Sequence, residues 1–290
     1  MLDARYHLFY LIAIFLMLGF GIMIGASYYG PVQVRQEKKV LDNLAAETNR
    51  VVQERHDARA RLDKDESALS ALVPALVRGK LAGRRVILIQ TGDYADATEA
   101  ANKAVTDAGA TVAATVVLTD KWGALLPRQR QALATFADPS DPASQDKALL
   151  AALASALAGG TPNGPPSVLD ALQGQGLMTV SGDLSQPCSL FVLVGGSRDD
   201  ALSSSLDGPL LDGFKAASTA VTLVGCEPFT AASSSIPAYQ NAGIATVDCI
   251  DLPLGQLALP FALRGDAGDY GLKPTAKTPL PDSLEGLSAP

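Results

Sequence analysis

The sequence has few of the side chains that carry acid–base or metal chemistry. Its 290 residues include two histidines, three cysteines and four methionines. Both histidines, His7 and His56, precede the region expected to form a globular domain, so histidine-based acid–base catalysis and a Ser-His-Asp triad are excluded there. The three cysteines form no CxxC pair and do not determine the redox compartment.

Charged side chains are also scarce, at 18% of the sequence against 48% hydrophobic residues. A chain with this much apolar surface can offset the entropy lost on ordering, which excludes intrinsic disorder. The formal net charge of −7 argues against a general nucleic-acid binder, because such binding needs clustered cations. The signatures GxGxxG, GxxxxGK(S/T) and GxSxG are absent, and we predict that the protein is not an enzyme.

The sequence does contain one long apolar run near its N-terminus. Residues 8–29 carry no charge and, as a helix, would span about 30 Å, the thickness of the hydrocarbon core of a membrane. Tyrosines cluster at both ends of the run, where a membrane interface favours them. We therefore predict a retained transmembrane anchor over residues 1–30. The alternative is a signal peptide cleaved after Ala26.

A polar segment with a heptad pattern follows, over residues 31–79. Gly30-Pro31 is expected to break or kink the helix before it. Apolar residues then recur at alternating steps of three and four, which predicts a coiled-coil stalk. A GxxxG spacing in the apolar run would also let two membrane helices approach closely, so we predict a parallel homodimer. The alternative for the segment is a single amphipathic helix lying on the globular domain. The predicted dimerisation residues are Gly21, Gly25, Leu41, Leu44, Val51, Leu62 and Leu69.

Strand-length apolar runs begin after residue 80 and alternate with helical segments. Such runs are typical of strands buried on both faces, so we predict an α/β domain over residues 80–264 with a parallel sheet, Rossmann-like or flavodoxin-like. A helix over residues 94–108 should stop at Gly109. The expected strands are residues 86–90, 111–118, 190–194, 220–224 and 244–250.

Two segments of the domain region are rich in residues that disfavour regular structure. Residues 137–167 are rich in Pro, Ser, Gly and Ala, and we expect a flexible insertion around one helix near residues 147–158. The tail over residues 265–290 is rich in Gly and Pro and is expected to be irregular.

Ligands in open α/β sheets bind beyond the carboxyl ends of the strands. At these positions the sequence places acids, which can hold a cation or a hydroxyl, and glycines, which let the backbone approach a ligand. The candidate ligand-binding residues are Asp93, Gly195, Gly196, Glu227, Asp248 and Asp251. The alternative is that Gly and Asp gather in these turns for conformational reasons alone.

Candidate metal ligands are few. Soft metals such as Cu(I) prefer thiolate and thioether ligands, but no CxxC, HxxxH or methionine cluster occurs. Cys226 and Cys249 are the candidates, because both fall near strand ends. They can equally form a disulfide or remain unpaired. No cofactor other than copper is indicated.

The order of these parts resembles the MctB family of copper transport proteins from bacterial envelopes. The resemblance covers nearly the whole chain, from an opening RYHL and a helix ending in GIMIG to the closing VDCIDLPLGQLALPFALRGDAGDYGLK. In that closing stretch, Asp248, Asp251, Gly255, Tyr270 and Gly271 look like recurring positions of the family. The resemblance implies a role in copper efflux or tolerance at the cell envelope, with a pore-forming activity proposed for the founding member.

The sequence and the resemblance disagree about the side of the membrane. Arg5 stands alone before the apolar run and three cations follow it, so the positive-inside rule places the domain in the cytoplasm. The resemblance implies a single-pass protein of the bacterial cell membrane with its large domain outside the cytoplasm, and we adopt that orientation.

The leading hypothesis is a homo-oligomeric membrane protein of copper transport or homeostasis. Its expected partners are the lipid bilayer, a second copy and a copper ion, with no nucleic acid. The alternatives are a coiled-coil envelope scaffold without a metal and an α/β module that binds a small ligand.

Overall fold

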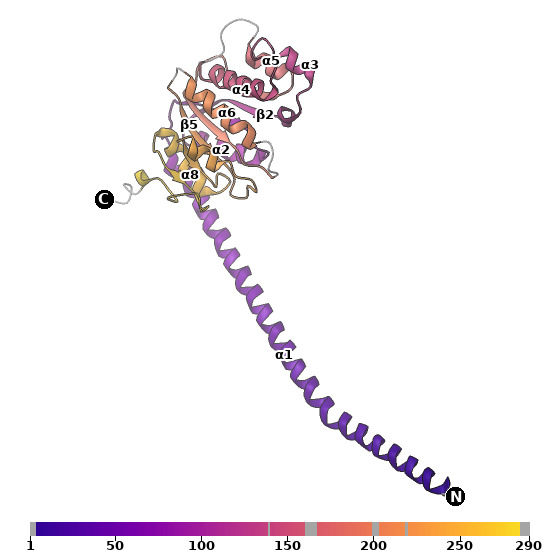
Figure 1. Ribbon diagram of the computed structural model, residues 1–290. Helices are drawn as coiled ribbons and strands as arrows, with labels where there is room; N and C mark the ends of the chain where they lie inside the picture. The colour runs from indigo at the N-terminus through magenta and orange to yellow at the C-terminus, as the bar shows by residue number, and fades with distance from the viewer. Residues whose placement is uncertain (1–3, 139, 160–166, 199–202, 218–219, 285–290) are drawn as a thin grey trace. The chain divides into compact units, whose positions relative to one another are not determined.

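The computed structural model describes residues 4–138, 140–159, 167–198, 203–217 and 220–284. Its contacts divide the chain into two units, residues 1–65 and 66–290. Most of the first unit is one long helix, α1 (Ala4–Val77), whose last turns belong to the second unit. The second unit is an α/β domain (Figure 1).

Gly30-Pro31 was expected to break or kink the helix, and of these two the break does not occur, because α1 continues through both residues. A proline inside a helix removes one backbone hydrogen bond and crowds the preceding turn. Many helical turns lie on each side of Pro31, and the loss of one hydrogen bond does not end so long a helix. The segments predicted as an anchor and a stalk are therefore parts of a single helical element.

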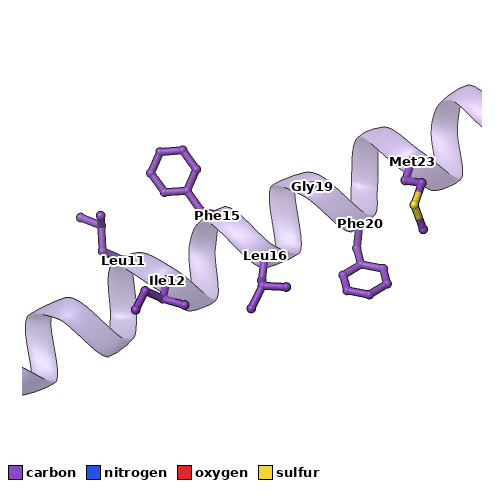
Figure 2. Close-up of a pocket in the computed structure, with 7 residues that line it drawn as sticks. All are labelled: Leu11, Ile12, Phe15, Leu16, Gly19, Phe20 and Met23. Atoms are coloured by element: carbon purple, nitrogen blue, oxygen red, sulfur yellow. The ribbon is translucent and has the colours of Figure 1, made fainter.

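The N-terminal part of α1 is long and apolar enough to cross a membrane, over Tyr6–Gly25. Figure 2 shows its apolar side chains projecting outward from the helix, with Phe15 and Phe20 on different sides and Gly19 leaving bare backbone between them. None of this span is buried by the residues that the structure describes. A helix that is apolar all round and uncovered is typical of a segment surrounded by lipid.

The domain is built on one seven-stranded sheet with the order β3-β2-β1-β4-β5-β6-β7. All neighbouring strands are parallel except β3, which pairs antiparallel with β2 at one edge, so the predicted parallel sheet is confirmed apart from this edge strand. The strands are β1 (Arg85–Gln90), β2 (Thr111–Leu118), β3 (Met178–Gly182), β4 (Leu190–Val194), β5 (Thr222–Cys226), β6 (Ala245–Val247) and β7 (Asp269–Tyr270).

Helices cover both faces of this sheet. Alternate strand residues face opposite sides, so Ile87 and Ile89 join one hydrophobic cluster while Val86 and Leu88 join the other. The first face is covered by α4 (Pro142–Gly159), α5 (Val168–Gly174), α6 (Ser203–Ala216) and α7 (Ile236–Asn241). The second face is covered by α2 (Ala95–Asp107), α8 (Pro253–Arg264) and the end of α1. The remaining short helices are η1 (Asp120–Ala124) and α3 (Pro127–Ala132).

The helix expected near residues 147–158 is α4, and it is part of the hydrophobic core. Leu149, Leu150 and Leu153 are fully buried, and the helix packs along α6. Figure 1 shows α3, α4 and α5 grouped together. The segment predicted as a flexible insertion therefore supplies one of the helices on the first face of the sheet, while residues 160–166 of it lie outside the described part of the chain.

The last turns of α1 also belong to the domain core. Val73 and Val77 are buried, and Leu69, one of the predicted dimerisation residues, packs against the same cluster. The other predicted seam residues lie in the first unit, and Leu41, Leu44, Val51 and Leu62 are each more than half exposed there. Among the described residues, the domain core thus takes up Leu69 and leaves these four seam residues exposed.

Candidate functional site

The turns that hold the candidate ligand-binding residues follow four neighbouring strands of the sheet. Asp93 follows β1, Gly195 and Gly196 follow β4, Glu227 follows β5, and Asp248 follows β6. Because these strands are parallel, all four turns lie at the carboxyl edge, as the sequence predicted for open α/β sheets. The contacts of each residue then decide whether it is available to a ligand.

Between β1 and β4 the backbone itself closes the edge. The amides of Thr91 and Gly92 both donate to the carbonyl of Val194, at 3.0 and 3.2 Å. A Cβ atom on Gly92 would collide with the carbonyl of Gly196. The glycine is required because two chain segments touch at this point, and they leave no room between them for a ligand.

The carboxylate of Asp93 binds the turn that follows β4. Its two carboxylate oxygens accept from the backbone amide of Arg198 at 3.1 and 3.2 Å. The guanidinium of Arg198 in turn lies 4.9 Å from the centre of the Tyr94 ring, a cation–π contact. Asp93 thus joins the loop that follows β1 to the loop that follows β4.

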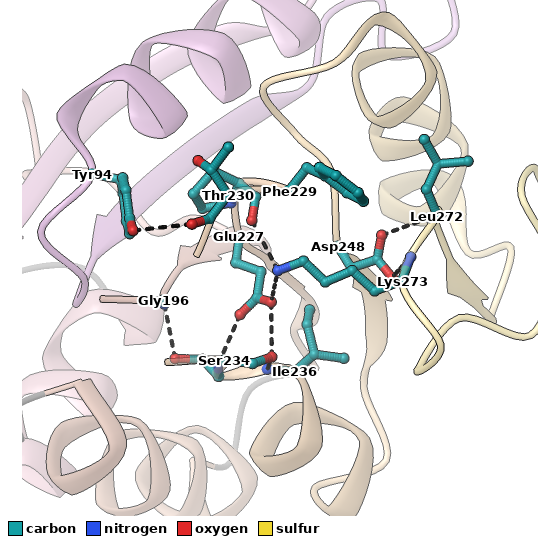
Figure 3. Close-up of polar contacts among 12 residues, drawn as sticks. Tyr94, Gly196, Glu227, Phe229, Thr230, Ser234, Ile236, Asp248, Leu272 and Lys273 are labelled. Atoms are coloured by element: carbon teal, nitrogen blue, oxygen red, sulfur yellow. Dashed lines mark hydrogen bonds and ion pairs between the residues drawn. The ribbon is translucent and has the colours of Figure 1, made fainter. Parts of the chain in front are cut away.

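Glu227 is fully buried and its carboxylate is fully partnered (Figure 3). Oε1 accepts from the Ser234 hydroxyl at 2.7 Å and from the Lys273 ammonium at 2.5 Å, and Oε2 accepts from the Ser235 amide at 2.7 Å. The ammonium also donates to the Pro228 carbonyl at 3.0 Å. A buried carboxylate needs such compensation, and here the chain supplies it from its own C-terminal region.

Asp248 and Asp251 bind backbone amides of neighbouring loops. Asp248 is buried and accepts from the amides of Leu272 and Lys273 at 2.8 and 3.0 Å. Asp251 accepts from the amide of Phe229 at 2.7 Å. Both carboxylates therefore shape the loops at the ends of β5 and β6.

The two candidate glycines after β4 make room for a tyrosine and a serine of the same chain. A Cβ atom on Gly195 would collide with the Tyr239 hydroxyl and the Ser235 side chain. The amide of Gly196 donates to the Ser235 hydroxyl at 2.9 Å. The sequence suggested that these glycines let a ligand come close to the backbone. In the structure, α7 and Ser235, the residue before it, occupy that space.

Sequence reasoning missed a buried carboxylate below this edge, Asp207 of α6. Its Oδ1 accepts from the Thr91 hydroxyl at 2.5 Å, while Oδ2 and the buried Tyr239 hydroxyl have no hydrogen-bond partner among the described residues. Burial raises the pKa of Asp207 to about 6, and nearby hydroxyls, Ser235 first, oppose that rise. Asp207 lies inside a helix rather than at a strand end, so no sequence pattern distinguished it.

The two candidate metal-ligating cysteines are buried free thiols. Burial raises the pKa of Cys226, with the negative charge of Glu227 adding to the effect. Burial also raises the pKa of Cys249 to about 12, with the charge of Asp248 as the next cause. Thiolates bind soft metals, and these environments favour the protonated form. Among the described residues, no group of three or more His, Cys, Asp or Glu side chains is placed to hold a metal ion.

These features together define a class of protein: a mostly parallel α/β domain that follows a helix long and apolar enough to cross a membrane. The chain belongs to the MctB family, because the family model described as "Copper transport outer membrane protein, MctB" matches residues 1–281. The resemblance found in the sequence is thereby confirmed.

Curated relatives with the name "Copper transporter MctB" come from Mycobacterium bovis and Mycobacterium tuberculosis. Each is 27% identical to this chain over 123 residues, which is 42% of this chain and 39% of the relative. The match thus spans about two fifths of the length of these relatives.

Proposed function

We propose that this chain is a membrane-anchored protein of the bacterial envelope that acts in copper transport or copper homeostasis, with its α/β domain outside the cytoplasm. The observation that carries the proposal is the family match over residues 1–281, which includes the candidate membrane span and the α/β domain together. The role is one of binding or assembly, and no enzymatic reaction is part of the proposal.

The donor atoms of the domain favour an indirect role in handling copper. Copper(I) as cargo prefers thiolate and thioether ligands, and the buried thiols of Cys226 and Cys249 are held in the protonated form. The acids at the sheet edge are occupied by internal partners, as with Glu227 and Lys273. The domain is therefore proposed to position or assemble the transport machinery rather than to chelate the ion at these residues.

A homodimer, or a higher homo-oligomer, is the second part of the proposal. Leu41, Leu44, Val51 and Leu62 are 52–65% exposed along one heptad seam, which an identical helix would cover in a coiled coil. The bare backbone at Gly21 and Gly25 supports close packing of two membrane helices. A single membrane helix encloses no pore, so any conducting role requires several copies.

The finer fold assignment is also proposed. Apart from the antiparallel edge strand, the parallel strands run in the order β2-β1-β4-β5-β6-β7. This order supports the flavodoxin-like arrangement over the Rossmann one, because only one parallel strand, β2, lies on the far side of β1, where the Rossmann order has two.

Deletion of the gene in the source organism is expected to raise cellular copper and to lower the copper concentration that stops growth. Both follow if the protein promotes copper export or sequestration outside the cytoplasm. Copper content by mass spectrometry and growth over a copper series measure the two effects, with zinc as the control metal. Unchanged values for both copper readouts would refute the role in copper handling.

Replacing Val51 by glutamate is expected to abolish dimerisation, whereas replacing Val52 by glutamate leaves it intact. Both valines are more than half exposed, but only Val51 lies on the predicted seam. Cysteine crosslinking of the full chain in membranes, from a cysteine introduced at Leu44, measures the fraction of dimer. Equal crosslinking in V51E and V52E would exclude the seam as the interface.

A scaffold without a ligand is the second candidate function, favoured by the internal pairing of the edge acids such as Glu227 and Asp248. The two functions differ in metal content. Two observations together support the scaffold. The full chain purified from copper-fed cells holds no copper, and the copper phenotype of the same strain is lost in the variant V51E.

A further inference from the structure

A short loop of the C-terminal region covers the carboxyl ends of β5 and β6; we call residues 271–278 the strap. Its base is closed by backbone bonds, since the Gly271 amide donates to the Thr278 carbonyl at 3.1 Å and the Lys277 and Thr278 amides donate to the Asp269 carbonyl. From that base the strap carries Lys273 toward the interior (Figure 3). A loop whose ends meet can move at its tip while its base stays in place.

The tip of the strap is held almost entirely by polar contacts. The Lys273 ammonium bonds Glu227 and Pro228, the Asp248 carboxylate accepts two strap amides, and the Gln240 side chain donates to the Thr275 carbonyl at 2.8 Å. Leu272 is half exposed, so little apolar surface is buried by the tip. Segments with few buried apolar contacts are the ones that open locally in native proteins.

Lys273 fills a site built for a primary ammonium group. Glu227 is 0% exposed and presents one carboxylate oxygen, and Pro228 presents a carbonyl oxygen, both within hydrogen-bond distance of the ammonium nitrogen. If the lysine leaves, Glu227 keeps only the Ser234 hydroxyl and the Ser235 amide, neither of which neutralises its charge. The emptied position is then strongly selective for a cation with N–H donors.

We propose that the strap is an autoinhibitory lid: Lys273 occupies an ammonium-binding site at Glu227, and local opening of residues 271–278 uncovers that site for a ligand that carries a primary ammonium group. Phe229 and Leu272, 45% and 50% exposed, lie near Lys273 (Figure 3) and suit a ligand whose ammonium is borne on an apolar stem. The proposal does not depend on a role in copper handling.

Hydrogen exchange on the full chain in detergent micelles tests the lid. In Lys273→Met, the amides of the strap are expected to exchange at least about tenfold faster, while those of β1 and β4 keep the rates of the unmodified protein. Lys277→Met is the matched control, because Lys277 belongs to the same strap but is 81% exposed and pairs only at the base, with Asp269. Unchanged strap exchange in Lys273→Met, or equal acceleration in the central strands, would overturn the lid.

The ammonium site is tested by chemical rescue of Lys273→Ala. Protonated n-butylamine at millimolar concentration is expected to slow strap exchange back toward the rate of the unmodified protein, whereas n-butanol and tetramethylammonium are not, because they lack the charge or the N–H donors. Lys277→Ala with the same additives is the control. Equal effects of the three additives, or none, would refute the ammonium site, and neither result bears on the copper phenotype.

Discussion

Replacing Gly225 by alanine is expected to lower the free energy of unfolding of the α/β domain by about 3 kcal/mol. Gly225 lies within β5, and a Cβ atom there would run into the ring of Tyr239, which is 0% exposed. The ring cannot move away easily, because its hydroxyl end lies against Gly195, the residue that follows the neighbouring strand β4. One added methyl group therefore strains two elements at once.

Urea unfolding of the full chain in detergent micelles measures this effect. Trp122, the single tryptophan of the sequence, is buried in the domain and reports its unfolding by fluorescence. Gly208→Ala is the control, since Gly208 lies within α6 with nothing within 4 Å of an added Cβ. There we expect no loss and a gain of up to about 1 kcal/mol. Equal stabilities of the two variants would show that the ring of Tyr239 does not require glycine in β5.

The sequence was most informative where burial leaves a local pattern. The runs at β1, β2 and β4 were identified within one residue because strands buried on both faces are continuously apolar. Strand β3 was missed, because an edge strand of sequence MTVSG has one exposed polar side and no long apolar run. Helix α8 was also missed, because Pro253 and Pro260 obscure its pattern although nearly all of it is buried.

The candidate site shows the limit of local patterns more clearly. The acids at the carboxyl edge were located from the strand ends alone, but their partners come from distant parts of the chain. Lys273 lies 46 residues from Glu227, and Thr91 lies 116 residues from Asp207. Spacing in the sequence cannot predict such pairs. Only the packed structure shows that the acids of the predicted ligand site are occupied by the protein itself.

Replacing Asp207 by asparagine is expected to stabilise the domain at neutral pH more than at acidic pH. Burial raises the pKa of Asp207 to about 6 in the folded protein, from an ordinary value of 3.8 in the unfolded chain. Between these two values the folded state holds a proton that the unfolded state releases, so this group makes the free energy of unfolding fall as the pH rises. Two pKa units correspond to about 3 kcal/mol. Asparagine has no such dependence, and its amide can donate to the unpartnered hydroxyl of Tyr239.

The difference between Asp207→Asn and the unmodified protein isolates this group, because all other ionisable groups are common to both. Trp122 fluorescence measures the free energy of unfolding of both proteins from pH 4 to pH 7.5. Over this range we expect the value for Asp207→Asn to rise relative to that of the unmodified protein by up to about 3 kcal/mol. Asp212→Asn, on the exposed side of the same helix, controls for the loss of one carboxylate. A difference that stays constant with pH would mean that Asp207 loses its proton as readily in the fold as in water. In that case solvent must reach Asp207 Oδ2 and the Tyr239 hydroxyl, which have no hydrogen-bond partner among the described residues. The packing of α6 against α7 at this edge would then be looser than the burial of Asp207 and Tyr239 implies.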